Sequence, residues 1–178
     1  MNVLITGVAG FIGFHLANYF LNKKVKVIGI DNLDDYYSIR LKNKRLHLLK
    51  KNKNFKFIKI DISSSKLQNY LKRYQFEIVV HLAAQAGVRY SLINPKKYIK
   101  SNISGFCNLF ESINSKKLKK VIYASSSSVY GDTKKFPTSE NQNLKPKNIY
   151  GYSKIMNEKM SDYYSKKFGI PYIGLRFF

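Results

Sequence analysis

Short apolar segments alternate along the whole chain with longer segments in which apolar residues recur at helical spacing. The short segments are rich in Val, Ile, Phe and Tyr and end at polar residues, which predicts strands. The predicted strands are Val3–Thr6, Val25–Ile30, Phe55–Ile60, Glu77–Leu82, Val121–Ala124 and Tyr172–Leu175. The predicted helices are Phe11–Leu21, Tyr37–Leu49, Ser65–Arg73, Tyr98–Ile113 and Ile149–Phe168.

This alternation predicts one α/β domain. Strands separated by helices form βαβ units, and their right-handed crossovers give a doubly wound parallel sheet, the Rossmann fold. The exception is Gly131–Asn148, which contains Pro137 and Pro146 and is predicted to be a long loop. Loops of this length often carry function when they lie near a site.

The composition supports a globular domain. Of the 178 residues, 44% are hydrophobic, yet no apolar run approaches the ~18 residues that span a bilayer. Val3–Ile5, directly after Met1, favours a strand over a charged secretion leader. The single cysteine, Cys107, excludes an internal disulfide and is expected to be a small core residue. We therefore expect a cytoplasmic protein without a membrane partner.

The formal charge is +22, from 32 Lys and Arg against 10 Asp and Glu. The basic residues are spread along the chain, with a denser stretch over Arg40–Lys59, and no recognisable nucleic-acid module accompanies them. A lysine-rich solvated surface explains this charge better than a nucleic-acid partner does. No group of His, Cys, Asp and Glu has metal-ligand spacing, so we expect no metal.

A glycine-rich turn joins the first predicted strand to the first predicted helix. Gly7, Gly10 and Gly13 have the spacing GxxGxxG, which differs from the usual dinucleotide fingerprint GxGxxG. Glycines at such a junction let the backbone approach a pyrophosphate, and free N–H groups at the helix start bind the anion. The position of the turn predicts a dinucleotide site, and a turn without a ligand is the alternative.

Two aspartates follow predicted strands. Asp31 lies 18 residues after Gly13, where a carboxylate would accept hydrogen bonds from the adenosine ribose and repel a 2′-phosphate. This favours NAD over NADP, and a capping role is the alternative. Asp61 follows the third strand, where contact with the adenine and capping of a loop are both open.

A serine, a tyrosine and a lysine form the candidate catalytic set. Tyr150 and Lys154 lie four residues apart on a predicted helix and share one face. A nearby ammonium is expected to lower the tyrosine pKa and make Tyr150 a general base near neutral pH. Ser126 lies just past a predicted strand, at the edge where ligands bind, and its hydroxyl would bond the reacting oxygen of a substrate. The Tyr150–Lys154 spacing alone is weak evidence for a catalytic site. It becomes strong evidence because the pair follows the glycine turn and the serine in this order.

In this order the motifs resemble the extended short-chain dehydrogenases/reductases, the NAD-dependent epimerase/dehydratase group, over essentially all 178 residues. The matching motifs are Thr6–Gly13, Asp31-Asn32, His81–Ala84, Asn102, Ser125-Ser126 with Val129–Gly131, and Tyr150-x-x-x-Lys154. Two further stretches, Asp31–Tyr37 and Ala83–Ser91 followed by Asn94-Pro95, are similar to the UDP-glucuronate 4-epimerase branch.

The resemblance implies NAD as cofactor and epimerisation at carbon 4 of a nucleotide sugar, UDP-glucuronate to UDP-galacturonate. Tyr150 would take the proton of the 4-hydroxyl, hydride would pass to NAD to give a 4-keto intermediate, and the hydride would return to the other face. Lys154 would hold the nicotinamide ribose. The implied substrate residues are Arg89, Ser126, Ser127 and Ser128. The implied cofactor residues are Gly7, Gly10, Phe11, Ile12, Gly13, Asp31, Asn32, Asp61, Ile62, Leu82, Ala83, Ala84, Gln85, Asn102, Tyr150 and Lys154.

Alternatives stay open. Nucleotide-sugar 4,6-dehydratases and a related decarboxylase place acidic residues before the Tyr-Gly pair, because elimination of water needs a general acid, whereas Ser126–Val129 has none. A non-catalytic NAD-binding fragment would keep the same fold. Family members continue past the position of Phe178, so residues 1–178 are expected to be the NAD-binding Rossmann domain without the smaller substrate domain, with little turnover alone. The full-length protein is expected to be a homodimer.

Overall fold

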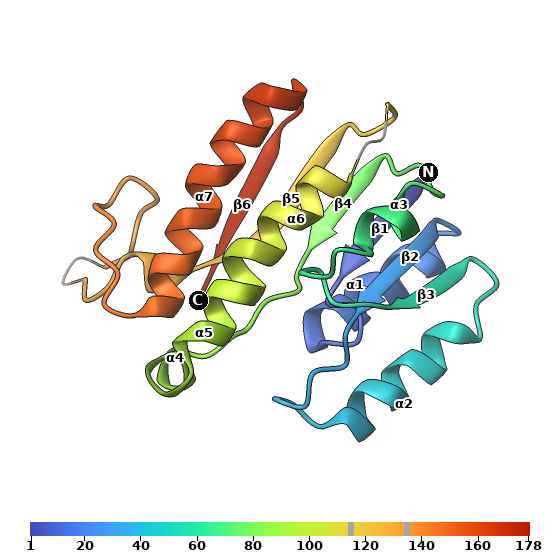
Figure 1. The fold of residues 1–178 in the computed structure, drawn as a ribbon, viewed down its shortest axis with the longest axis horizontal. Coiled ribbons are helices and arrows are strands. Elements are labelled where there is room, and N and C mark those ends of the chain that lie inside the picture. Colours follow the sequence, from blue (N-terminus) through green and yellow to red (C-terminus); the bar gives the residue numbers. More distant parts are fainter. Residues whose placement is uncertain (114–115, 134–135) are drawn as a thin grey trace.

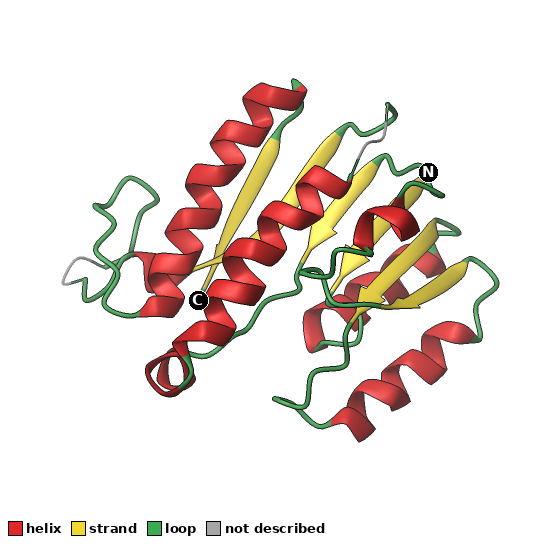
Figure 2. Ribbon diagram, in the orientation of Figure 1, coloured by secondary structure: helices red, strands yellow, loops and turns green. Residues whose placement is uncertain are grey.

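The strands form one parallel sheet with helices on both faces (Figure 1). The computed structural model describes residues 1–113, 116–133 and 136–178. Within these ranges the sheet has six strands in the order β3-β2-β1-β4-β5-β6, and their arrows run the same way in Figure 2. They are β1 (Asn2–Thr6), β2 (Lys26–Asp31), β3 (Phe55–Lys59), β4 (Ile78–His81), β5 (Lys120–Ser126) and β6 (Tyr172–Phe177). The predicted doubly wound Rossmann fold is confirmed.

Each face of the sheet has its own apolar core. Helices α1 (Phe11–Asn22) and α2 (Ile39–Lys50) cover one face, around buried residues such as Ile5 and Leu46. The other face packs against α3 (Leu67–Leu71), α6 (Gly105–Ser112) and α7 (Ile149–Phe168). Side chains of a strand alternate between the two faces, so the inner strands contribute to both cores. The strand order reverses beside β1, and ligands bind at the carboxyl ends of strands near such a point.

Helix caps set the ends of two helices. The Ser38 hydroxyl accepts a hydrogen bond from the Leu41 N–H at the start of α2, and the Asn148 side chain accepts one from the Gly151 N–H at the start of α7. Helix α7 ends at Gly169 in the left-handed region, at φ 66°. Helix α1 has no side-chain cap, which leaves its first N–H groups available to a ligand.

The predicted helix over Tyr98–Ile113 has a different form in the structure. Helix α4 (Val88–Ile93) precedes it, and Asn94 separates α4 from α5 (Pro95–Tyr98), which continues as a π-helical segment (Ile99–Ser104) into α6. Proline fits the first turn of a helix because it lacks an N–H, so the helix starts at Pro95. The prediction placed this start three residues late and missed α4.

Two further segments frame the site. Strand β5 extends to Ser126, so this serine is the last residue of the strand. The prediction had placed it just past the strand. A 3-10 turn (Ser127–Val129) follows, and the described residues of Gly131–Asn148 contain neither helix nor strand, as predicted. In the described ranges, no helix is long and apolar enough to cross a membrane.

Candidate cofactor and catalytic site

A cavity of about 500 Å³ opens at the carboxyl ends of β1, β2 and β4. The glycine turn forms one side, and the segments that follow β2, β3 and β4 form the others. Of the predicted cofactor residues, Gly7, Gly10, Phe11, Ile12, Gly13, Asp31, Asn32, Asp61, Ile62, Leu82, Ala83, Ala84 and Gln85 line it. The structure therefore brings together residues that are up to 78 positions apart (Gly7 to Gln85) in the chain.

The glycine turn requires two of its glycines for backbone reasons. Gly7 has φ 70°, and a Cβ there would lie 2.8 Å from the Ala83 nitrogen. A Cβ on Gly13 would overlap the Gly7 carbonyl oxygen. The Gly10 N–H bonds that same oxygen, so the N–H groups of Phe11, Ile12 and Gly13, at the start of α1, have no acceptor in the helix. Three such donors at a helix N-terminus fit the charge and size of a pyrophosphate.

Asp31 ties the end of β2 to the glycine turn. Its Oδ2 accepts a hydrogen bond from the Ala9 N–H at 3.1 Å, and its Oδ1 accepts one from the Leu33 N–H at 2.8 Å. The side chain lines the cavity while only 6% of the residue is exposed. The Lys42 ammonium lies 4.0 Å from Oδ1. Asp31 therefore caps the turn and also faces the cavity, and its contact with a ribose stays a prediction.

Asp61 and Asn32 form the neighbouring wall. The Asn32 amide donates to Asp61 Oδ2 at 2.9 Å, and the Ser63 N–H and hydroxyl donate to Asp61 Oδ1. Burial alone would raise the pKa of Asp61, but these hydrogen bonds outweigh it and lower the pKa below its ordinary value. Asp61 stays ionised and caps its own loop at the edge of the cavity.

Asn102 lies behind the cavity wall. It is buried and does not line the cavity, unlike most of the predicted cofactor residues. Its amide accepts from the Gln85 N–H at 2.8 Å and donates to the Gln85 carbonyl at 3.0 Å and to the Ser153 hydroxyl at 3.0 Å. Asn102 thus fixes the segment after β4 against α7, and it supports the cavity wall from behind.

Ser126, Tyr150 and Lys154 come together between β5 and α7. The Ser126 hydroxyl lies close enough to the Tyr150 phenol to lower its pKa. The Lys154 ammonium donates to the Ala124 carbonyl at 2.9 Å and lies 5.8 Å from the centroid of the Tyr150 ring. Because Ala124 lines the cavity, the three side chains lie beside its wall, although none of the three lines it.

The predicted fall in the Tyr150 pKa is wrong for this arrangement. Burial raises the pKa of Tyr150, and the Ser126 hydrogen bond offsets this only in part. Burial also lowers the pKa of Lys154 to about 8. The ammonium bonds a backbone carbonyl instead of the phenol oxygen, so it does not stabilise the phenolate enough to reverse the effect of burial.

The buried face of α7 is polar where most helices are apolar. Ser153, Lys154, Asn157 and Ser161 are each no more than 3% exposed. Asn157 donates to the Asn102 carbonyl at 2.6 Å, and Ser161 donates to the Tyr123 hydroxyl at 2.6 Å. Hydrogen bonds therefore join α7 to β5 and to the segment around Asn102, and they fix the orientation of Tyr150 and Lys154.

The predicted substrate residues are placed apart from the cavity. Arg89 is exposed on α4 and, within the described ranges, has no ion pair and does not line the cavity. Ser127 and Ser128 lie half-buried on the 3-10 turn, and the Ser128 N–H donates to the Ser126 hydroxyl at 3.2 Å. Their contact with substrate stays a prediction.

The sequence prediction missed a basic side of the cavity. Lys42, Arg45, Lys97 and Lys100 line it. Arg45 donates to the Ala9 carbonyl at 3.2 Å, and Lys97 pairs with Asp34 at 3.0 Å. The positions of Lys42 and Arg45, three apart on one helix within the dense basic stretch, were the available signal.

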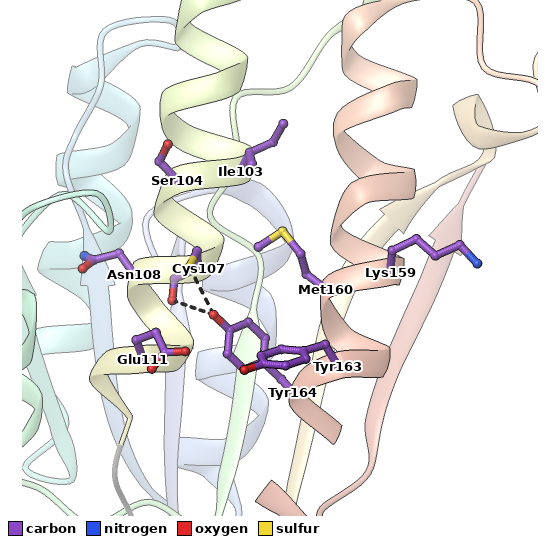
Figure 3. A pocket seen from close by; sticks show the side chains of 9 residues that line it. All are labelled: Ile103, Ser104, Cys107, Asn108, Glu111, Lys159, Met160, Tyr163 and Tyr164. Carbon is purple, nitrogen blue, oxygen red and sulfur yellow. Dashed lines mark hydrogen bonds between the residues drawn. The ribbon is translucent and has the colours of Figure 1, made fainter. Parts of the chain in front are cut away.

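A second, more open groove of about 730 Å³ lies on the outer side of α6 and α7 (Figure 3). Cys107 lines it and is exposed, so its prediction as a core residue is wrong. Its position on α6 turns the sulfur outward, where it lies 3.1 Å from the Tyr164 hydroxyl. Among the described residues no group of His, Cys, Asp and Glu is arranged to hold a metal.

The family model described as GDP-mannose 4,6 dehydratase matches residues 4–178. The chain is an extended short-chain dehydrogenase/reductase. This confirms the family that the motifs resembled, and it places the glycine turn, Ser126 and the Tyr150–Lys154 pair inside the matched region.

This short-chain dehydrogenase/reductase has relatives of about twice its length. An uncharacterized protein from Methanocaldococcus jannaschii is 51% identical over 99% of the chain and 56% of that relative. A UDP-glucuronate 4-epimerase from Thermodesulfobacterium geofontis is 41% identical over 98% of the chain and 54% of the enzyme, and UDP-glucuronate 4-epimerase 4 from Arabidopsis thaliana is 42% identical over 100% of the chain and 41% of the enzyme. The chain spans about half the length of the curated relatives it matches.

Solved structures of this family superimpose closely on the short-chain dehydrogenase/reductase chain. The UDP-glucuronic acid 4-epimerase from Bacillus cereus, in complex with UDP-glucuronic acid and NAD, has a TM-score of 0.90 and 37% identity over 99% of the chain and 56% of that structure. The UDP-Glc/GlcNAc 4-epimerase from Campylobacter jejuni has a TM-score of 0.90 and 31% identity over 99% of the chain and 53% of that structure. Several solved structures of the family contain NAD.

Proposed function

We propose that this chain binds NAD and supplies the serine, tyrosine and lysine of a nucleotide-sugar 4-epimerase that acts on UDP-glucuronate. The observation that carries the proposal is one continuous cavity. Free N–H groups of α1 face it on one side, and Ala124, whose carbonyl holds Lys154, lies on another. An extended dinucleotide needs an anion site and a reaction site in the same cavity.

The residues fit NAD at each of its parts. The N–H groups of Phe11, Ile12 and Gly13 would hold the pyrophosphate. Asp31 would accept from the adenosine ribose, in addition to its two backbone donors. When bound, NAD would accept a hydride from carbon 4 of the sugar and return it, which leaves the cofactor unchanged overall.

The proton steps fall to the chain itself. Tyr150 would take the proton of the sugar 4-hydroxyl, so a 4-keto sugar forms, and would give it back when the other epimer is made. Ser126 would hold the same oxygen through its hydroxyl. Because burial raises the pKa of Tyr150, we expect a positive charge beside the phenol to be needed for this step, and Lys154 is the cation nearest in sequence on the same helix face.

An epimerase fits this site better than a dehydratase does, although the matching family model is described as a dehydratase. Loss of water needs a protonated acid at the leaving hydroxyl. Ser126–Val129 contains no carboxylate, and Glu158, which bonds Ser125, is paired with Arg176 at 2.9 Å. The pairing keeps the pKa of Glu158 low despite its burial, so it has no proton to donate.

Calorimetric titration of the 178-residue chain with NAD tests the cofactor step. We expect saturable binding to the native chain. Ala84→Phe, which would fill part of the cavity wall, should bind much more weakly. No binding to the folded native chain would refute the proposal.

Incubation of the full-length protein with NAD and UDP-glucuronate tests the reaction. We expect UDP-galacturonate and no net reduction of NAD. A 4-keto-6-deoxy product from a nucleotide sugar, or release of carbon dioxide, would replace epimerisation with one of the alternatives.

A homodimer and a cytoplasmic location complete the proposal for the full-length protein. The groove between α6 and α7 supports the dimer, since the exposed Tyr163 and the half-buried Met160 line one apolar surface there. Sedimentation of the full-length protein should give a dimer, and Tyr163→Lys should give a monomer. A native monomer would contradict this part, and fractionation of cells would test the location.

A further inference from the structure

Glu158 is the centre of a half-buried ionic cluster that joins α7 to the residue before Ser126. It accepts a hydrogen bond from the Ser125 hydroxyl at 2.6 Å. Arg176 donates to both of its carboxylate oxygens, through Nε at 2.9 Å and Nη2 at 2.9 Å. The side chains of Arg176 and Glu158 are 21% and 17% exposed, so the pair is largely shielded from water. We call Ser125, Glu158 and Arg176 the serine clamp.

The serine clamp connects β5, α7 and β6, three of the elements that surround the reacting groups. Ser125 precedes Ser126 at the end of β5, Glu158 lies on α7 two turns after Tyr150, and Arg176 lies at the end of β6. Arg176 also donates to the Tyr130 hydroxyl at 2.9 Å and to the Glu140 carbonyl at 3.0 Å, and so reaches the long loop. One guanidinium therefore fixes two strand ends, a helix and a loop.

The clamp also reaches β5 from α7 through one hydrogen bond, and it differs from the other such links because Arg176 holds the carboxylate that accepts this bond. Lys154 bonds a backbone carbonyl, and Ser161 bonds the Tyr123 hydroxyl, which are single contacts. A bidentate pair of arginine and carboxylate is stiffer, because two parallel hydrogen bonds fix both planes. Ser125 carries this stiffness to the backbone of β5 beside Ser126.

We propose that the serine clamp is the positioning device that holds the Ser126 hydroxyl against Tyr150. The role rests on the proposed function, because the Ser126–Tyr150 contact serves proton transfer only if the chain handles a sugar hydroxyl. Ser125, Glu158 and Arg176 touch neither the cavity nor the reacting groups and act through Ser126. The clamp residues are positioning residues and not catalytic ones.

The chemical shift of the Tyr150 phenol carbon tests this directly, because it reports on hydrogen bonding of the hydroxyl at neutral pH and needs no cofactor. The chain is labelled with [ζ-13C]tyrosine, and Tyr150→Phe identifies the resonance. Ser126→Ala gives the value without the serine bond. We expect Ser125→Ala and Arg176→Lys to move the Tyr150 shift toward the Ser126→Ala value. Ser125→Thr, which keeps the hydroxyl, should restore the native shift.

Lys167→Ala is the matched control, because it breaks an ion pair between α7 and α6, that of Lys167 with Glu111, away from the clamp. It should leave the Tyr150 shift unchanged. Should Arg176→Lys fail to fold, the pair of Ser125 variants decides alone. A native Tyr150 shift in folded Ser125→Ala overturns the proposal, as does a native shift equal to that of Ser126→Ala. Failure of NAD to bind in the calorimetric test would instead refute the proposed function and leave these shifts as they are.

Discussion

Asp31 holds the glycine turn and faces the cofactor cavity at the same time. Its two oxygens already accept from the N–H groups of Ala9 and Leu33. Each carboxylate oxygen has a further lone pair, so a ribose hydroxyl can still be bound. The negative charge is partly balanced by Lys42, which lies 4.0 Å away. A change at this position therefore affects affinity for any dinucleotide as well as the choice between two of them.

Asp31→Ala should lower affinity for NAD by about tenfold, because the turn loses a charged acceptor for the Ala9 N–H. The ratio of NAD to NADP affinity should also fall, since a 2′-phosphate no longer meets a carboxylate. Calorimetric titration with both nucleotides measures this. Asp35→Ala removes the same charge from a side chain that is 83% exposed and should change neither value. An unchanged ratio in Asp31→Ala would remove Asp31 from cofactor selection.

His81 gives the chain a pH-dependent stability. Its Nδ1 lies 2.7 Å from the Thr6 hydroxyl, and burial, followed by the Lys154 charge, lowers its pKa from 6.5 to about 3. Between these values the unfolded chain binds a proton that the folded chain does not. Protonation therefore favours unfolding, so the contribution of His81 is present above 6.5 and is lost as the pH falls toward 3.

Urea unfolding of the native chain and of His81→Leu checks this dependence. The native chain should lose unfolding free energy relative to the variant between about pH 7 and about pH 4. If the difference in unfolding free energy between the two chains is the same at both pH values, His81 takes up its proton in the folded chain as readily as in the unfolded chain.

At the scale of single residues, the structure brings Ser126, Tyr150 and Lys154 together, as their order and spacing indicated, and their catalytic roles stay predictions. The direction of the Tyr150 pKa shift was predicted wrongly, because it depends on how deeply the ring is buried and on which oxygen Lys154 bonds. Those two facts are set by tertiary packing, which periodicity does not contain.

The first turn of α1 is the element on which the cofactor site depends most directly. Gly13 sits inside that turn, and a Cβ there would overlap the Gly7 carbonyl oxygen. The backbone can relieve the overlap only by moving the helix start away from β1. The N–H groups of Phe11 and Ile12 would move with it.

Gly13→Ala should therefore lower the unfolding free energy by about 1–3 kcal/mol and weaken NAD binding more than that loss explains. Gly169→Ala is the comparison, since it strains a glycine at φ 66° in open space at the far end of α7. It should cost about 1 kcal/mol and leave NAD affinity as it was. Chemical denaturation and calorimetry separate the two effects. Equal NAD affinity of native chain and Gly13→Ala would show that the turn tolerates the methyl group.

Strands and most helices were predicted within one to three residues of their ends, because each has a clear apolar period. The stretch from Val88 to Ile113 was not predicted correctly. Its π-helical part places Asn102 where one amide reaches both Gln85 and Ser153. A wide turn of this kind is held by bonds to distant segments, and nothing in the local spacing of apolar residues announces it.

At the level of the whole molecule, β6 leaves one edge of the sheet open. Ile173, Leu175 and Phe177 are about 40% exposed, at 39%, 43% and 40%. They point away from α7, because Tyr172 and Arg176 on the alternate positions contact the other face. An edge strand with free backbone groups and apolar side chains is a template for pairing with another copy.

Self-association of the 178-residue chain should therefore grow with salt, which screens the repulsion between copies that each carry +22. Leu175→Lys should suppress it. Leu92→Lys adds the same charge at a site that is 71% exposed on α4 and should have a much smaller effect. Light scattering over a range of salt concentrations measures the difference. Association that is equal in both variants would locate the contact elsewhere.

The polar underside of α7 has a consequence for protein engineering. Ser153, Asn157 and Ser161 occupy positions where leucine would bury more apolar surface. Replacing such polar networks with well-packed apolar residues often makes a domain more stable. A redesigned chain of that kind would withstand more heat, yet α7 could then slide or rotate over the sheet and its tyrosine would lose a defined direction. Selection for thermostability alone would thus be expected to produce a stable Rossmann domain in which Tyr150 no longer has the orientation that the proposed reaction needs.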